Sequence, residues 1–232
     1  MINKSKNKYF ARFIVAFVMI SLLFIPLTST LAASIQKTKC FDYFFKQNRK
    51  IIIIDAGHGG TDPGSVKRGI QEKDINLQIA LKLQKRLERK GYKVVMTRTD
   101  DTAISLINRA KLANKAKGDL LISIHQNSFK DSSVHGIEAF YNPGKETLDG
   151  QLANCIQEAL INYTQAKDRH VRAVTNLVVI REAKMPACLI ESAYISNDTE
   201  RELIQTKDYQ DKVVTGIMEG IKNFLNEQAK SS

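Results

Sequence analysis

Three residues that can do chemistry, two histidines and one glutamate, each follow or end an apolar run. His58 follows the run 51–55, His125 ends "DLLISIH", and Glu191 ends "ACLIE". If these runs are buried strands of an α/β sheet, their carboxyl ends lie at the edge where such sheets gather their sites. Burying an imidazole or a carboxylate costs free energy unless the group is paired or binds a metal. Three such residues at one edge therefore indicate a functional site.

Two imidazoles and a carboxylate are a typical ligand set for catalytic zinc, which takes three protein ligands and leaves a fourth position to water. Glu72 stands just ahead of a helical pattern that begins near Ile75, so its side chain can reach back to His58. Asp74 is expected to cap that helix, which leaves Glu72 free to bind a metal. The alternative is a set of hydrogen-bonded structural histidines and acids, and the residues alone leave both interpretations open.

The segment after His58 is rich in glycine, so a phosphate-binding loop is an alternative interpretation to a metal site. The gap from Gly59 to Gly64 fits the spacing G-x-x-x-x-G-K-[ST], but Ser65 stands where that motif requires lysine. A nucleotide site is therefore not expected, and the glycines are better explained by backbone that turns sharply beside a metal ion. A serine hydrolase is not indicated either, because no serine lies in a G-x-S-x-G elbow.

Residues 1–33 have the pattern of a signal peptide or an N-terminal membrane anchor. A basic start is followed by the apolar segment 13–27 and then by the small residues of "TLA" at 30–32. The apolar segment is shorter than the about 20 residues of a typical membrane-spanning helix. Either interpretation places the domain that follows this segment outside the cytoplasm, secreted or anchored at the cell wall. Residues 34–49 are expected to be a linker.

The net charge of +11 at pH 7 suggests an anionic partner such as a cell wall or a membrane surface, or simply a solvated surface. Nucleic acid is not expected as a partner, because no aromatic–basic motif appears. The three cysteines (Cys40, Cys155 and Cys188) form no C-x-x-C pair, so any metal must be bound by nitrogen and oxygen. Cys188 is expected to pack as a small apolar residue.

Strand-like and helix-like runs alternate over residues 50–227. This alternation predicts a single α/β domain with a twisted, mainly parallel sheet of about six strands, flanked by helices, with the metal site at the carboxyl ends of the strands. Strands are expected at 51–54, 92–98, 119–125, 136–141, 176–180 and 187–191. Helices are expected at 75–91, 106–117, 152–163 and 213–225.

Over nearly all of residues 50–225 the chain is similar to the zinc-dependent N-acetylmuramoyl-L-alanine amidases that cleave bacterial peptidoglycan. "DAGHGGTDPG" and "EKDINLQIA" resemble the motifs that supply the first two zinc ligands, here His58 and Glu72. "SIHQN" resembles the motif of the third ligand, His125, and "PACLIESAYISN" the motif of the catalytic glutamate, Glu191. The chain departs from the last motif at Ala193 and Tyr194, where the family has glycine and phenylalanine.

The resemblance implies one zinc ion and hydrolysis of the amide between N-acetylmuramic acid and L-alanine, with Glu191 as the general base. It also implies peptidoglycan as the partner and allows for an activating protein. The short form of the chain is most similar to the amidases of spore-forming bacteria, which implies a role in cell-wall or spore-cortex remodelling. The alternatives are a non-catalytic wall-binding module and another zinc hydrolase, either a peptidase or a carbohydrate deacetylase.

The remaining histidines and two arginines have plainer expected roles. His135 and His170 lie in polar segments and are expected to be ordinary loop residues. Arg98 and Arg181 are candidates for contacts with carboxylates of the stem peptide, although surface salt bridges are the simpler expectation for both.

Overall fold

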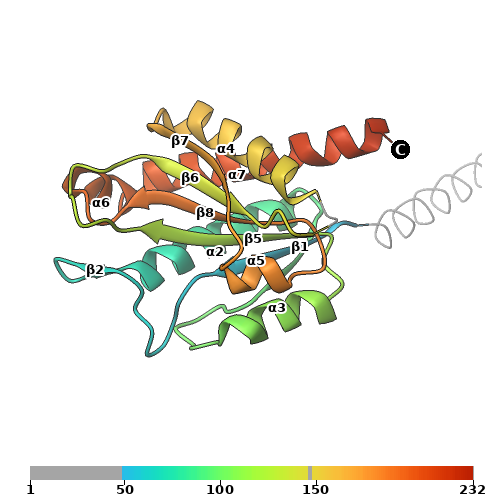
Figure 1. Ribbon diagram of the computed structural model, residues 1–232, viewed down its shortest axis with the longest axis horizontal. Helices are drawn as coiled ribbons and strands as arrows, with labels where there is room; N and C mark the ends of the chain where they lie inside the picture. Colours follow the sequence, from blue (N-terminus) through green and yellow to red (C-terminus); the bar gives the residue numbers. More distant parts are fainter. Residues whose placement is uncertain (1–48, 146–147, 232) are drawn as a thin grey trace, which may run out of the picture. The chain divides into compact units, whose positions relative to one another are not determined.

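Six strands form one sheet in this computed structural model, which describes residues 49–145 and 148–231 (Figure 1). Across the sheet the order is β4 (Lys93–Met96), β1 (Ile51–Ala56), β5 (Leu120–Asn127), β8 (Ala187–Tyr194), β6 (Ile137–Tyr141) and β7 (Asp168–Ala173). The strands β4, β1, β5 and β8 are mutually parallel, β6 is antiparallel to β8, and β7 is parallel to β6. The predicted mainly parallel sheet is confirmed.

Helices cover both faces of this sheet. They are α2 (Glu72–Arg89), α3 (Leu106–Lys115), α4 (Asp149–Thr164), α5 (Val178–Glu182), α6 (Asp198–Ile204) and α7 (Lys207–Ser231). A two-stranded ribbon, β2 (Val66–Lys67) and β3 (Ile70–Gln71), precedes α2. Helices α2, α4 and α7 bury one face, and the shorter α3 and α5 cover part of the other (Figure 1).

The central strands are apolar on both faces because both faces are covered. Ile52 and Ile54 of β1 join the core beneath α2, α4 and α7, whereas Ile53 joins the smaller core beneath α3 and α5. A continuous β-branched run is therefore what this position in the sheet requires. Cys188 in β8 is fully buried in the larger core, as expected of a small apolar residue.

Helices α4 and α7 pack closely because α7 presents two glycines to α4. A β-carbon added at Gly220 would lie 2.5 Å from the α-carbon of Ile156, and one at Gly216 would lie 2.9 Å from that of Leu160. Any larger residue at these positions would force the two helices apart. Within this pair, α4 contacts β6 and β8 directly.

The prediction of a strand at 176–180 is wrong. Val178–Glu182 form the short helix α5, in which Val179 and Ile180 are buried. In a short run of apolar residues, the spacing of apolar and polar positions does not distinguish a strand from one turn of a buried helix. The sixth strand is instead β7, whose sequence "DRHVRA" is mostly polar because it lies at an edge of the sheet. Helix α6 was also not expected.

Several boundaries differ from the sequence prediction near the candidate site. Strand β5 runs two residues past His125, and β8 runs three residues past Glu191. Helix α2 begins at Glu72 itself, and Asp74 lies in its first turn; the N-cap residue is Gln71, which makes no side-chain capping bond. The expected capping role of Asp74 is therefore wrong.

The expectations for the signal or anchor segment at 1–33, and for the linker up to residue 48, concern residues outside the described ranges. Residues from Lys50 onward form one compact unit. Within 49–145 and 148–231, no helix has both the length and the apolar character needed to cross a membrane.

Candidate metal centre

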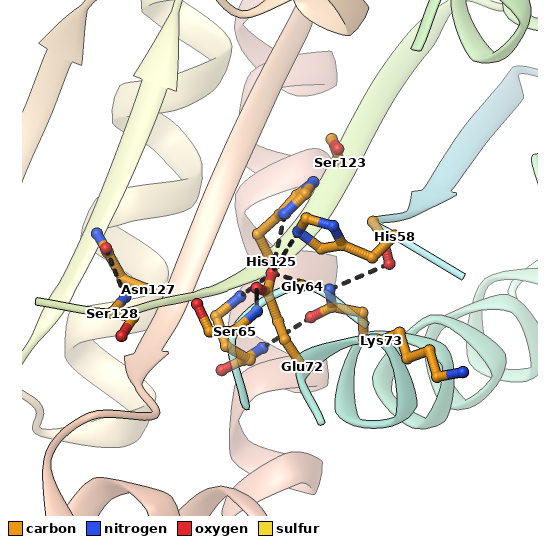
Figure 2. Close-up of polar contacts among 12 residues, drawn as sticks. His58, Gly64, Ser65, Glu72, Lys73, Ser123, His125, Asn127 and Ser128 are labelled. Carbon is orange, nitrogen blue, oxygen red and sulfur yellow. Dashed lines mark hydrogen bonds and ion pairs between the residues drawn. The ribbon is translucent and has the colours of Figure 1, made fainter. Parts of the chain in front are cut away.

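The three predicted ligand residues come together from three elements. His58 follows β1, Glu72 is the first residue of α2, and His125 lies in β5. The Oε1 atom of Glu72 lies 3.2 Å from Nε2 of His58 and 3.0 Å from Nδ1 of His125. In Figure 2, dashed lines join the carboxylate to both imidazole rings, whose centroids are 4.9 Å apart. One potential ligand atom from each residue lies within 4.8 Å of the other two.

Two glycines leave room for these side chains. A β-carbon added at Gly57 would lie 2.3 Å from the His125 ring, and one at Gly64 would lie 2.6 Å from Oε2 of Glu72. His58 itself has φ of 61°, a left-handed conformation that costs free energy for a residue with a β-carbon. Such strain is commonly found where a side chain is held for function.

Backbone amides fix the carboxylate of Glu72. Its Oε2 accepts a hydrogen bond from the amide of Ser65, and its Oε1 accepts one from the amide of Gln126. Burial alone would raise the pKa of Glu72, but the hydrogen bonds and charges of His125 and His58 hold it far below its ordinary value. The group is therefore an ionised acceptor, the form that binds a metal.

Asp62 is a functional residue that the sequence reasoning missed. Its Oδ2 lies 2.8 Å from Nδ1 of His58, so Nε2 of the same ring faces Glu72. Burial opposes a charge on His58, yet Glu72 and Asp62 together raise its pKa. A carboxylate behind a histidine is the usual way to orient a metal-binding imidazole. Its place four residues after His58, in the glycine-rich loop, was the available signal.

Two buried arginines hold the backbone that carries His58. Arg109 pairs with the fully buried Asp55 at 2.8 Å and donates to the carbonyls of Ala56 and His58. Arg98 donates to the carbonyls of Ala56 and Gly57. Arg98 is buried and holds the backbone of this loop. It therefore has neither of its expected roles, which were a contact with the substrate and a surface salt bridge.

Glu191 lies beside the three-residue cluster, on the neighbouring strand. It pairs with His125 across β5 and β8, so both side chains point to the same face of the sheet. Its Oε2 is buried and has no hydrogen-bond partner among the described residues. Burial, followed by the nearby charges of Glu72 and Glu138, raises its pKa well above the ordinary value. An unpaired carboxylate in such a place is a candidate for proton transfer.

A pocket of about 270 Å³ opens beside the cluster. Its wall includes His58, His125 and Arg109, together with Ile104 and Leu106 at the start of α3. The cluster is therefore accessible to a substrate from the face that α3 and α5 leave partly open.

The remaining predicted residues lie away from this cluster. His135 is in an exposed loop, as expected, where Nδ1 lies 2.8 Å from the carbonyl of Ser133. His170 is not in a loop, because it belongs to the edge strand β7. Arg181 forms a salt bridge with the adjacent Glu182, as the simpler expectation had it.

Comparisons with known proteins identify the family of the chain. Residues 52–223 match the family model Amidase_3, described as N-acetylmuramoyl-L-alanine amidase. The germination-specific N-acetylmuramoyl-L-alanine amidase of Bacillus subtilis (strain 168) is 32% identical over 193 residues, which cover 77% of this chain and 81% of that protein.

Two solved structures have the same fold. An N-acetylmuramoyl-L-alanine amidase from Clostridium difficile 630 is 39% identical, with a TM-score of 0.75 over 77% of this chain and 98% of the other. The CwlD amidase from Clostridioides difficile, solved in complex with the GerS lipoprotein, is 34% identical, with a TM-score of 0.73 over 77% and 99%. From its fold, its motifs and these matches, the chain belongs to the Amidase_3 family of N-acetylmuramoyl-L-alanine amidases.

Proposed function

We propose that this amidase acts on peptidoglycan with one zinc ion held by His58, Glu72 and His125. The observation that carries the proposal is the position of Glu72, whose Oε1 lies within 3.2 Å of imidazole nitrogens from two other elements. Two imidazoles and one carboxylate are a set that zinc accepts, and three protein ligands leave its fourth position open.

The surroundings of the three residues fit a metal centre as well. Gly57 and Gly64 make room for the ligand side chains, and Asp62 orients one imidazole. Ser65 and Gln126 hold the carboxylate through their backbone amides. These supporting contacts are the kind that keep a ligand set in place before the metal binds.

The bond cleaved joins the lactyl carboxyl of N-acetylmuramic acid to the amine of L-alanine. When bound, zinc supplies a Lewis acid that polarises the scissile carbonyl and acidifies water. Glu191 takes the proton of the attacking water on its carboxylate and passes it to the nitrogen of the departing amine.

Product analysis tests this proposal. Purified cell-wall sacculi are incubated with metal-depleted protein, with and without added zinc, and the soluble products are identified by mass spectrometry. We expect zinc-dependent release of intact stem peptides with a free L-alanine amino terminus, while the glycan strands keep their length.

Other products would identify the alternatives. New reducing ends would indicate a glycosidase, and acetate release would indicate a deacetylase. Shortened stem peptides left on the muramic acid would indicate a peptidase. A protein that binds sacculi and releases nothing would be a wall-binding module. Each of these results would contradict the proposed reaction.

We also propose that the enzyme works outside the cytoplasm, with residues 1–33 as a signal peptide or membrane anchor. The basic start and apolar segment of the sequence support this location. The similarity to a germination-specific amidase supports a role in the spore cortex, and the CwlD–GerS complex supports a protein partner. That this partner activates the enzyme is part of the proposal. Amino-terminal sequencing of the mature protein, and cortex analysis of a deletion strain, test the location and the role.

A further inference from the structure

The edge strand β7 carries two arginines that point to the face of the sheet that holds Glu191. On a regular strand, residues three apart point to opposite faces. Here Ile137 pairs with Asp168, whereas Ala139 pairs with Val171, so β7 contains one extra residue. Arg169 and His170 together lie opposite Glu138, and His170 has φ of 65°. This bulge puts Arg169 and Arg172 on the same face, and bulges commonly re-aim side chains beside active sites.

Both arginines converge on one buried carboxylate. Nε of Arg169 lies 3.7 Å from Oε1 of Glu138, and Nη1 of Arg172 lies 3.4 Å from Oε2. Glu138 already accepts hydrogen bonds from Asn127 and from the hydroxyl of Tyr194. Both guanidinium groups thus lie against Glu138, and Arg169 is also near the acidic group of Glu200. The surplus positive charge is therefore carried by the more exposed Arg172.

The donors of the two arginines are incompletely used. The buried Nε of Arg169 makes no hydrogen bond among the described residues, and the side chain of Arg172 is 62% exposed. Each guanidinium lies over an aromatic ring, Arg169 over Tyr194 at 5.2 Å and Arg172 over Phe140 at 5.9 Å. Stacking of this kind limits the movement of a guanidinium and leaves its edge free for a planar anion.

The surplus charge lies close to the candidate catalytic residue. Glu138 and Glu191 are direct partners across β6 and β8, and Glu191 pairs in turn with His125. Strands lie about 4.8 Å apart, so β7 is about 10 Å from the strand of Glu191. An extended peptide covers that distance in about three residues.

We infer that Arg172, with Arg169 beside it, binds the free carboxylate at the second residue of the stem peptide, counted from the bond that is cleaved. The inference rests on the proposed function, because it takes peptidoglycan as the substrate. The stem peptide carries free carboxylates, and a guanidinium is the side chain best suited to bind them in a fixed orientation. Arg172 is thus a specificity-determining residue for the amidase reaction.

The test compares two synthetic muramoyl peptides that differ only at the second residue, which has either a free α-carboxylate or the carboxamide. Zinc-loaded full-length wild type is expected to prefer the carboxylate form about 10-fold in kcat/KM, the value of a charge-assisted hydrogen bond at a partly exposed site. Arg172→Gln is expected to remove this preference by raising KM for the carboxylate form, with little change for the carboxamide. Arg172→Lys is expected to keep part of the preference.

Arg89→Gln is the matched control, because Arg89 is an exposed arginine in the last turn of α2. It is expected to behave as wild type on both substrates. An Arg172→Gln enzyme that loses activity equally on both substrates, or a wild type without preference, would overturn the inference while leaving the amidase reaction intact. Failure of the wild type to cleave either substrate at the muramoyl–alanine bond would instead contradict the proposed function.

Discussion

At the residue scale, His58 shows how much of a candidate metal centre is decided by its neighbours. Its ring faces Glu72 through Nε2 because Nδ1 is held by Asp62, and its backbone is held in a left-handed turn by Arg109. The histidine and the glutamate could be predicted from residue type and position. Asp62 was harder to recognise, because its place four residues after His58 in the glycine-rich loop gains meaning only from the turn that brings the two side chains together.

Replacing His125 with alanine tests the ligand set. His125→Ala removes one of three proposed ligands, and we expect zinc content in the purified protein to fall sharply. The measurement is metal content by inductively coupled plasma mass spectrometry, with circular dichroism to check the fold. His135→Ala serves as the control, because His135 is exposed and its Nδ1 lies against the carbonyl of Ser133. Unchanged zinc in His125→Ala would show that the ligand set is wrong.

At the element scale, two irregular strands shape the site in ways that the sequence pattern does not show. In β8 the pairing shifts by one residue between Glu191 and Tyr194, and in β7 it shifts at His170. The alternation of apolar and polar residues locates a strand, but it does not show where an extra residue is inserted. The sequence predicts that β5 and β8 end at His125 and Glu191, because the apolar runs stop there, whereas both strands continue for two or three residues.

The junction of β1 with the following loop depends on a buried ion pair. Arg109→Met would leave Asp55 as a buried, unpaired charge and would remove hydrogen bonds to two carbonyls. Breaking such a pair typically costs about 3 to 5 kcal/mol, so we expect a loss of that size in the free energy of unfolding at pH 7. Urea denaturation measures it, and Arg89→Met, at an exposed position, is expected to cost much less.

The same pair predicts how this loss depends on pH. Burial would raise the pKa of Asp55, but Arg109 and the hydroxyls of Ser123 and Thr97 hold it below the ordinary value. Because the pKa of Asp55 is lower in the folded protein than in the unfolded chain, its ionised carboxylate stabilises the fold above about pH 3.9, the ordinary pKa of aspartate. This stabilisation is lost as the pH falls through the lower pKa of the folded protein. The difference between wild type and Arg109→Met is therefore expected to narrow in acid. A difference that does not change with pH would mean that packing, and not charge, is responsible.

At the scale of the whole molecule, the topology brings together residues that are far apart in the chain. The parallel order β1–β5–β8 places the ends of three strands side by side, and α2 starts at the same edge. The fold class and the meeting of His58, Glu72, His125 and Glu191 followed from this topology, which the alternating pattern predicts. The cationic group of Arg169 and Arg172 could not be predicted, because β7 is polar and its place at the sheet edge is set by tertiary pairing.

The four residues have a proposed division of roles, in which three bind zinc and Glu191 moves the proton. The most direct test is a paired measurement of zinc content and stem-peptide release on one preparation of Glu191→Gln. The amide keeps the shape of the carboxylate but not its basicity, and general acid–base catalysis contributes about 10²- to 10⁴-fold. Glu219→Gln, at a position on α7 that is paired with Lys222, is the control.

We predict that Glu191→Gln keeps zinc at the wild-type level of one ion per chain. Peptide release is expected to fall by at least about 100-fold, which is the smallest loss expected when a general acid–base group is removed. Loss of zinc from this variant would make Glu191 a ligand. Full zinc content together with wild-type peptide release would contradict its role in proton transfer.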